Sequence, residues 1–130
     1  HAEWNVKEVD IRGILSDSVE GIRQLCVDRN IELHAVYDAG ETLMLGDRDR
    51  LNQVFVNLLS NAMKFCDESQ GKVSVRLSQH MGILLVEVSD NGAGIEKSAQ
   101  AYIFDNLLSA CGCSSLISLY GSIAYFTIHL

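Results

Sequence analysis

Apolar residues recur every three or four positions between residues 9 and 27, at Ile11, Ile14, Leu15, Val19, Ile22, Leu25 and Cys26. This spacing predicts an amphipathic helix with one buried stripe, because side chains three and four apart share a helix face. Similar spacing from Leu51 to Phe65 predicts a second helix over residues 47–66. Asp47 is its expected N-cap, since a carboxylate can accept the amide protons of the first turn.

Alternation of apolar and polar residues predicts the strands. Residues 31–38 alternate, and a short strand is expected over residues 42–46. Residues 72–78 and 83–90 are two more strands, and the short glycine-containing link between them predicts a hairpin. A weakly alternating run over residues 123–130 predicts a last strand, after an irregular segment. The order of elements predicts a two-layer α/β sandwich, with helices on one face of a mixed, mostly antiparallel sheet.

Composition narrows the class of protein. A length of 130 residues suits one compact domain, residues 1–130. The 17 acidic and 10 basic residues give a net charge of -7 without any basic stripe, which argues against a nucleic-acid partner. No run approaches the roughly 20 apolar residues that a membrane helix needs. We therefore expect a soluble, cytoplasmic domain, which could still be a piece of a parent anchored to the inner membrane.

The four cysteines are Cys26, Cys66, Cys111 and Cys113. The last two form a C-x-C pair, with no second pair nearby to complete a zinc site. Reduced thiols are the expected state.

Three polar residues interrupt the apolar surface of the second helix: Asn57, Asn61 and Lys64. At about 100° per residue they fall on one narrow stripe at the border of the core. The stripe is consistent with a solvent-facing side. It is also consistent with a binding site, because amide oxygens suit a hard cation and an ammonium group suits phosphate. Asparagine is a mediocre helix former, which favours the binding site.

A second motif, VSDNGAGI, occupies residues 88–95 directly after an apolar strand. Asp90 at the end of the strand could accept hydrogen bonds from an amino group. Gly92 and Gly94 allow close approaches that larger residues forbid. The same D-N-G sequence is also ordinary turn chemistry, so the motif alone is weak.

Together, in this order, the two motifs resemble the ATP-binding catalytic domain of sensor histidine kinases. That domain belongs to a superfamily with gyrase, the ninety-kilodalton heat-shock chaperones and mismatch-repair ATPases. The N box matches residues 47–65, DRDRLNQVFVNLLSNAMKF, and the first glycine box matches residues 86–95, VEVSDNGAGI. YIFDNL at residues 102–107 resembles the phenylalanine-containing box. The fold that this resemblance implies is the Bergerat fold.

The resemblance also implies ATP and Mg²⁺ as cofactors and assigns roles to individual residues. Asn61 would ligate Mg²⁺ with help from Asn57, Lys64 would contact phosphate, Phe65 would lie against adenine, Asp90 would bind the adenine amino group, and Gly92, Gly94 and Ile95 would shape that pocket. In the hydrolysing branches, a glutamate that activates water stands where this chain has Asn57. Asparagine is no general base, so the site suits transfer of a phosphoryl group to another nucleophile.

In the kinases, that nucleophile is a histidine on a separate dimerisation and phosphoacceptor domain made of helices. The histidines of this chain are expected to be structural or incidental: His1, His34, His80 and His129. We therefore expect a fragment of a larger kinase, with a response regulator as an indirect partner and no catalytic residue in this chain.

The resemblance breaks after Asn106. Where the family has a mobile lid, a G-x-G-x-G motif and a third helix, residues 107–119 read LLSACGCSSLISL with a lone Gly112. We expect the lid and third helix to be missing or shortened, and the chain alone to be inactive. A degenerate nucleotide-binding or protein-interaction module and a serine kinase of the anti-sigma-factor type remain alternatives. An apolar surface there could support a homodimer, through Leu107, Leu108, Leu116, Ile117 and Leu119.

Overall fold

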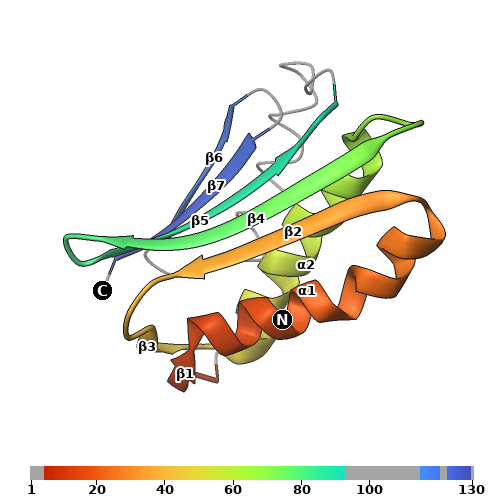
Figure 1. Ribbon diagram of the computed structural model, residues 1–130. Helices are drawn as coiled ribbons and strands as arrows, with labels where there is room; N and C mark the ends of the chain where they lie inside the picture. The colour runs from red at the N-terminus through yellow and green to blue at the C-terminus, as the bar shows by residue number, and fades with distance from the viewer. Residues whose placement is uncertain (1–4, 93–114, 121–122, 130) are drawn as a thin grey trace.

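The computed structural model describes residues 5–92, 115–120 and 123–129, the last two ranges as backbone only. The elements follow in the order β1 (Lys7–Asp10), α1 (Ile11–Asp28), β2 (Ile31–Asp38), β3 (Leu43–Gly46), α2 (Arg48–Phe65), β4 (Gly71–His80), β5 (Ile83–Asp90), β6 (Ser115–Tyr120) and β7 (Ile123–His129). Figure 1 shows the two helices side by side beneath one face of a twisted sheet.

The main sheet has five strands in the order β2-β4-β5-β7-β6. Strands β2 and β4 are parallel, and the other three pairs are antiparallel. The predicted two-layer sandwich with a mixed, mostly antiparallel sheet is therefore confirmed. The prediction that the third helix is missing concerns a region that lies largely outside the described residues.

The core fills the space between the two helices and the inner face of β4 and β5. Fully buried side chains from all these elements meet there, among them Ile14, Leu15, Phe55, Leu58, Leu59, Val73, Leu77, Leu84 and Val86. Each large apolar side chain buried in this way contributes about 1.5–3 kcal/mol. The buried stripe of α1 is narrower than predicted, because Leu25 is 49% exposed.

A two-stranded ribbon that the pattern did not predict stands at the start of α1. Strand β1 pairs antiparallel with β3, so the short strand near residues 42–46 belongs to this ribbon and not to the main sheet. Helix α1 begins at Ile11 and not near Val9, because Val9 lies in β1. The amide of Ile11 donates to the carbonyl of Thr42 over 3.0 Å, which ties the helix start to the ribbon.

Strand β6 corrects a second prediction. Part of the segment expected to be irregular forms this edge strand, which pairs with β7 from Ser115↔Ile128 to Tyr120↔Ile123. His80, expected in the hairpin link, ends β4 opposite Ile83. The hairpin itself is confirmed, and its turn is tight because Met81 and Gly82 both adopt positive φ, 47° and 81°.

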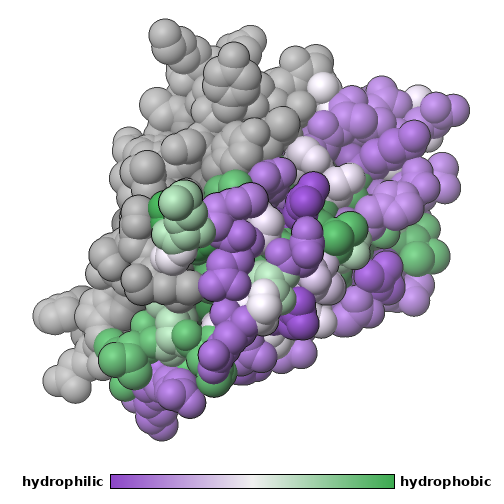
Figure 2. Space-filling view, turned by 60° about the vertical axis from the view of Figure 1, so that its left-hand side comes forward, coloured by the Kyte–Doolittle hydropathy of each residue, from purple (hydrophilic) through white to green (hydrophobic). Residues whose placement is uncertain are grey.

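Apolar side chains reach the surface of the described part in separate patches divided by hydrophilic residues (Figure 2). The most exposed are Val6, Leu25, Val27, Val36, Leu43, Leu45 and Met81. Of the residues named for a possible homodimer surface, Leu107 and Leu108 lie outside the described residues. For Leu116, Ile117 and Leu119, only the backbone in β6 is described.

Candidate functional site

Asp47 sets the start of α2 and hence the position of every residue on it. Its carboxylate accepts hydrogen bonds from the amides of Asp49 (3.1 Å) and Arg50 (3.3 Å), as an N-cap does. Its second oxygen accepts from the amide of Asn5 over 2.9 Å. The predicted cap is therefore confirmed, and the helix runs from there to Phe65.

The predicted polar stripe lies in the C-terminal half of α2. Asn57 and Asn61 are half-buried, Lys64 is exposed, and the neighbouring Leu58 and Ala62 are buried. The stripe thus follows the border of the core, one helical turn from Asn57 to Asn61. Neither asparagine side chain forms a hydrogen bond with another described residue. These paired amide oxygens are a donor set that fits a hard cation such as Mg²⁺.

Lys64 and Phe65 close the helix. The Nζ atom of Lys64 lies 5.4 Å from the centroid of the Phe65 ring, a cation–π distance. The half-buried Phe65 ring packs against the edge of the core. An ammonium group and an aromatic ring are therefore presented together at the end of α2.

Asp90 ends β5, opposite Val73 of β4. The amide of Gly92 donates to its Oδ1 over 2.8 Å, so the chain bends directly after the strand. Burial raises the pKa of the Asp90 carboxyl above its ordinary value of 3.8, and the Gly92 hydrogen bond offsets part of that rise. Asp90 is consequently a half-buried acceptor at the end of β5, and one of its two carboxylate oxygens is already bonded to the Gly92 amide.

Gly92 joins the two motifs. A Cβ added to it would lie 1.7 Å from the backbone oxygen of Phe65 and 2.9 Å from Oδ1 of Asp90. The backbone of the loop after β5 therefore packs directly on the last turn of α2, an approach that glycine alone permits. This contact brings Asp90 and Gly92 to the end of the helix that carries Asn61, Lys64 and Phe65.

Asn91 is a residue that the sequence reasoning missed. Its Oδ1 accepts from the amides of Asp67 (3.1 Å) and Lys72 (2.9 Å), and its Nδ2 donates to the carbonyl of Gln70 (2.6 Å). Its own amide donates to the carbonyl of Lys72 over 3.2 Å. An asparagine directly after a strand is the signal that could have pointed to such a clasp, since its side chain favours bonds to nearby backbone.

Gly94 and Ile95, the remaining predicted site residues, lie outside the described residues, as does the segment that resembles the phenylalanine-containing box. The structure therefore brings together Phe65, Asp90 and Gly92, and places Asn57, Asn61 and Lys64 on the helix that leads to them.

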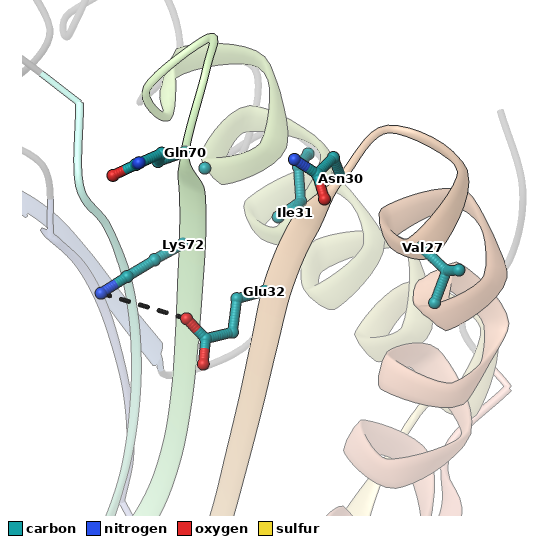
Figure 3. Close-up of a pocket in the computed structure, with 7 residues that line it drawn as sticks. Val27, Asn30, Ile31, Glu32, Gln70 and Lys72 are labelled. Carbon is teal, nitrogen blue, oxygen red and sulfur yellow. Dashed lines mark ion pairs between the residues drawn. The ribbon is translucent and has the colours of Figure 1, made fainter.

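A separate pocket of about 460 Å³ opens on the other side of β4. It is lined by Val27, Asn30, Ile31, Glu32, Gln70, Gly71 and Lys72, and Figure 3 shows the charged pair on its wall. Nζ of Lys72 lies 4.0 Å from Oε2 of Glu32, and both side chains are more than half exposed. None of the predicted site residues lines this pocket.

Cysteines and acidic groups supply no alternative metal centre within the described part of the chain. No group of three or more His, Cys, Asp or Glu side chains there could hold a metal ion. Cys26 and Cys66 are buried and free, and burial raises the pKa of both thiols. Cys111 and Cys113 lie outside the described residues. Neither described helix is long and apolar enough to cross a membrane.

Residues 46–121 match the family model of the histidine kinase-, DNA gyrase B-, and HSP90-like ATPases. The chain belongs to this ATPase family. The matched span begins just before the cap of α2 and includes both the polar stripe and the loop from Asp90 to Gly92. The resemblance drawn from these two motifs is thereby confirmed.

Several curated proteins that this chain resembles are named as sensory or sensor kinases. The adaptive-response sensory kinase SasA of Prochlorococcus marinus (strain MIT 9303) is 32% identical over 102 residues, which are 78% of this chain and 27% of that protein. The chain thus spans about a quarter of the length of this relative.

Solved structures agree on the fold. The catalytic domain of histidine kinase ThkA, in a nucleotide-free form, superposes with a TM-score of 0.79 at 21% identity, over 98% of this chain and 97% of that one. ThkA in complex with the response regulator protein TrrA gives a TM-score of 0.76 at 19% identity, over 97% of this chain and 42% of that one. Full-length ShkA in complex with AMPPNP gives 0.73 at 27% identity, over 97% and 31% of the two chains.

Proposed function

We propose that this chain is the ATP-binding catalytic module of a two-component sensor histidine kinase, which transfers the γ-phosphoryl group of Mg-ATP to a histidine on another domain. The observation that carries the proposal is the packing of Gly92 on the carbonyl of Phe65. This contact gathers an aromatic ring, an ammonium group and a half-buried carboxylate at one end of a helix lined with amide oxygens. Membership of the ATPase family and the AMPPNP complex of ShkA support it.

Each residue has a role in this proposal. Asn61 and Asn57 would hold Mg²⁺, which supplies charge neutralisation on the phosphates, and Lys64 would contact phosphate. Phe65 would lie against the adenine, and the free oxygen of Asp90 would accept from the adenine amino group. Gly92 would shape the adenine pocket, together with Gly94 and Ile95.

The nucleophile is proposed to come from outside this chain. Asn57 cannot take a proton from water at neutral pH, which disfavours hydrolysis. A histidine on the helical dimerisation and phosphoacceptor domain of a larger parent kinase is the proposed acceptor. A response regulator would then receive the phosphoryl group, as the ThkA–TrrA complex suggests by analogy. The cytoplasm would be the site of this reaction.

A degenerate module of the same fold is the second candidate. Residues 107–119 carry one glycine, where the family has a glycine-rich motif, and part of this segment forms β6. Amides at a glycine-rich helix start normally embrace the phosphates. A chain without them could bind adenine and yet fail to position the triphosphate.

Calorimetric titration distinguishes the two candidates. The 130-residue chain is titrated with Mg-ADP and Mg-AMPPNP, then with each nucleotide in EDTA. Asp90→Asn and Asn61→Ala are compared with Ser60→Ala, which truncates an exposed residue of the same helix. We expect Mg²⁺-dependent binding that each site variant weakens by about 10- to 150-fold, the value of a charge-assisted hydrogen bond.

The control Ser60→Ala should bind as the wild type does. Binding that is equally strong in EDTA would favour a degenerate module that holds the adenine without positioning the phosphates. Absence of binding at millimolar nucleotide would contradict the kinase proposal and favour a degenerate interaction module. Binding that Asp90→Asn leaves unchanged would place the adenine elsewhere.

A further inference from the structure

The Asn91 side chain is exposed, and it nevertheless forms three hydrogen bonds with the backbone. Both lone pairs of Oδ1 accept backbone amides, from Asp67 and Lys72, and Nδ2 donates to the carbonyl of Gln70. The amide of Asn91 also donates to the carbonyl of Lys72, so Asn91 makes four bonds: two to the segment between α2 and β4, at Asp67 and Gln70, and two to Lys72 at the start of β4. We call Asn91 and these four bonds the Asn91 clasp.

The side-chain chemistry of the clasp is specific to asparagine. An aspartate offers the two acceptor sites and lacks the N–H that Gln70 accepts. A glutamine has the right groups on a stem one carbon longer. Alanine leaves the amides of Asp67 and Lys72 without these partners.

The position of the clasp relates it to the site. Asn91 stands between Asp90 and Gly92, and the segment that it holds begins two residues after Phe65. Gly92 packs on the carbonyl of Phe65, and the side chain of Asn91 accepts from the amide of Asp67, two residues further along. The residues that follow β5 are therefore held to the end of α2 at two points, next to the predicted adenine contacts Phe65 and Asp90.

We propose that Asn91 is a positioning residue of the nucleotide site: it sets the spacing between the Asp90 carboxylate and the Lys64–Phe65 end of α2 without touching the nucleotide. This inference rests on the proposed function. The ladder between β4 and β5 would pair without the side chain, because it extends from Val73↔Asp90 to His80↔Ile83 through backbone bonds. The side-chain bonds are thus additional to this ladder, and two of them reach Asp67 and Gln70 in the segment that follows α2.

The test compares affinity with stability in the full 130-residue chain. Asn91→Ala and Asn91→Asp are measured for the Kd of Mg-ADP and for unfolding in urea, at a temperature where each variant is folded. Asn52→Ala is the matched control, since it removes an exposed asparagine that accepts a hydrogen bond from Ser18 (2.7 Å) near the other end of α2. Amide hydrogen exchange at Asp67 and Lys72 reports on the clasp itself.

We expect Asn91→Ala to weaken Mg-ADP by about tenfold, the effect of about one hydrogen bond on an equilibrium. The amides of Asp67 and Lys72 should exchange faster, and Asn52→Ala should leave the Kd unchanged. Asn91→Asp keeps both acceptor sites, so it should fold and protect these amides better than Asn91→Ala does.

Three results would overturn the inference. The first is a Kd of Asn91→Ala that stays within about twofold of the wild type, which would make the clasp purely structural. The second is unchanged exchange at Asp67 and Lys72, which would show that the clasp does not form in solution. The third is a wild-type chain that binds no nucleotide, which would remove the proposed function as well.

Discussion

At the scale of single residues, Asp90 shows a conflict between stability and binding. Its carboxyl is half-buried, and burial raises its pKa while one amide hydrogen bond compensates in part. A raised pKa means that the folded chain binds a proton more tightly than the unfolded chain does. The ionised form needed to accept from an adenine amino group is therefore held at a cost to the fold.

This cost predicts a pH dependence that can be measured. Because the folded pKa lies above the ordinary value of 3.8, the contribution of Asp90 to the free energy of unfolding should fall as pH rises through that value and through the folded pKa. Asp90→Asn cannot ionise and keeps an oxygen for the Gly92 amide. Its stability relative to the wild type should therefore increase from pH 3 to pH 7 in urea titrations.

Asp28→Asn is the control variant, because it removes an exposed carboxylate at the end of α1 and is measured in the same urea titrations. A stability difference between Asp90→Asn and the wild type that is flat across this pH range would contradict the burial argument. A folded Asp90→Asn that fails to bind nucleotide would separate binding from folding.

At the scale of elements, α2 depends on its first turn. Asp47 is the acceptor for the amides of Asp49 and Arg50 and for the amide of Asn5, which precedes β1. The hydrogen bond from Asn5 is the largest cause of the lowered pKa of the Asp47 carboxyl, ahead of the helix amides. The Asp47 carboxylate thus fixes both the start of α2 and the residue that leads into β1.

Asp47→Ala should lower the thermal midpoint, and Asp47→Asn, which keeps one oxygen, should lower it less. Since the folded pKa is lowered, the stabilisation should be present above pH 3.8 and be lost as pH falls through the folded pKa. Thermal unfolding followed by circular dichroism at pH 7 and pH 3 measures this. Asp49→Ala, which removes an exposed carboxylate of the same turn, is the control. Equal midpoints for Asp47→Ala and Asp49→Ala at pH 7 would show that the cap is dispensable.

At the scale of the whole molecule, the proposed function predicts that the phosphorylated histidine lies on another domain. His34, His80 and His129 all lie in strands of the main sheet, and the ring of His34 is paired with Glu32 over 2.9 Å. The 130-residue chain incubated with γ-labelled Mg-ATP should acquire no acid-labile label. Label should appear when the helical phosphoacceptor domain of the proposed parent kinase is added. Label on His34 or His80 in the chain alone would contradict this prediction.

Local patterns predicted the parts of this fold that local sequence determines. The two helices, β2 and the β4–β5 hairpin follow from periodicity and from a glycine turn, and the cap at Asp47 from one side chain. Strand β1 was missed because it is defined by a distant partner, β3. Strand β6 pairs with the next strand along the chain, and it was missed because its sequence, SLISLY, does not alternate strictly between apolar and polar residues. Strand β1 has four residues with one buried side chain, and it is a strand through pairing with β3.

The sequence likewise indicated some features of the candidate site and not others. Its individual residues stood out as polar groups on an apolar helix and as glycines after a strand. An asparagine after a strand could have indicated side-chain bonds to nearby backbone, but the contact of Gly92 with Phe65 and the partners of Asn91 could not be predicted, because they depend on how the loop after β5 meets the end of α2. The metal and nucleotide roles stay predictions that the titrations above test.

The position of β7 within the sheet has a consequence for synthesis on the ribosome. Residues 123–129 lie between β5 and β6, so the last of the described strands along the chain is an inner one. Until it has emerged from the exit tunnel, β5 keeps an unpaired edge and β6 has nothing to pair with. Nascent chains stalled before residue 123 should therefore recruit chaperones and be cut readily by protease, whatever the length of the helices already formed.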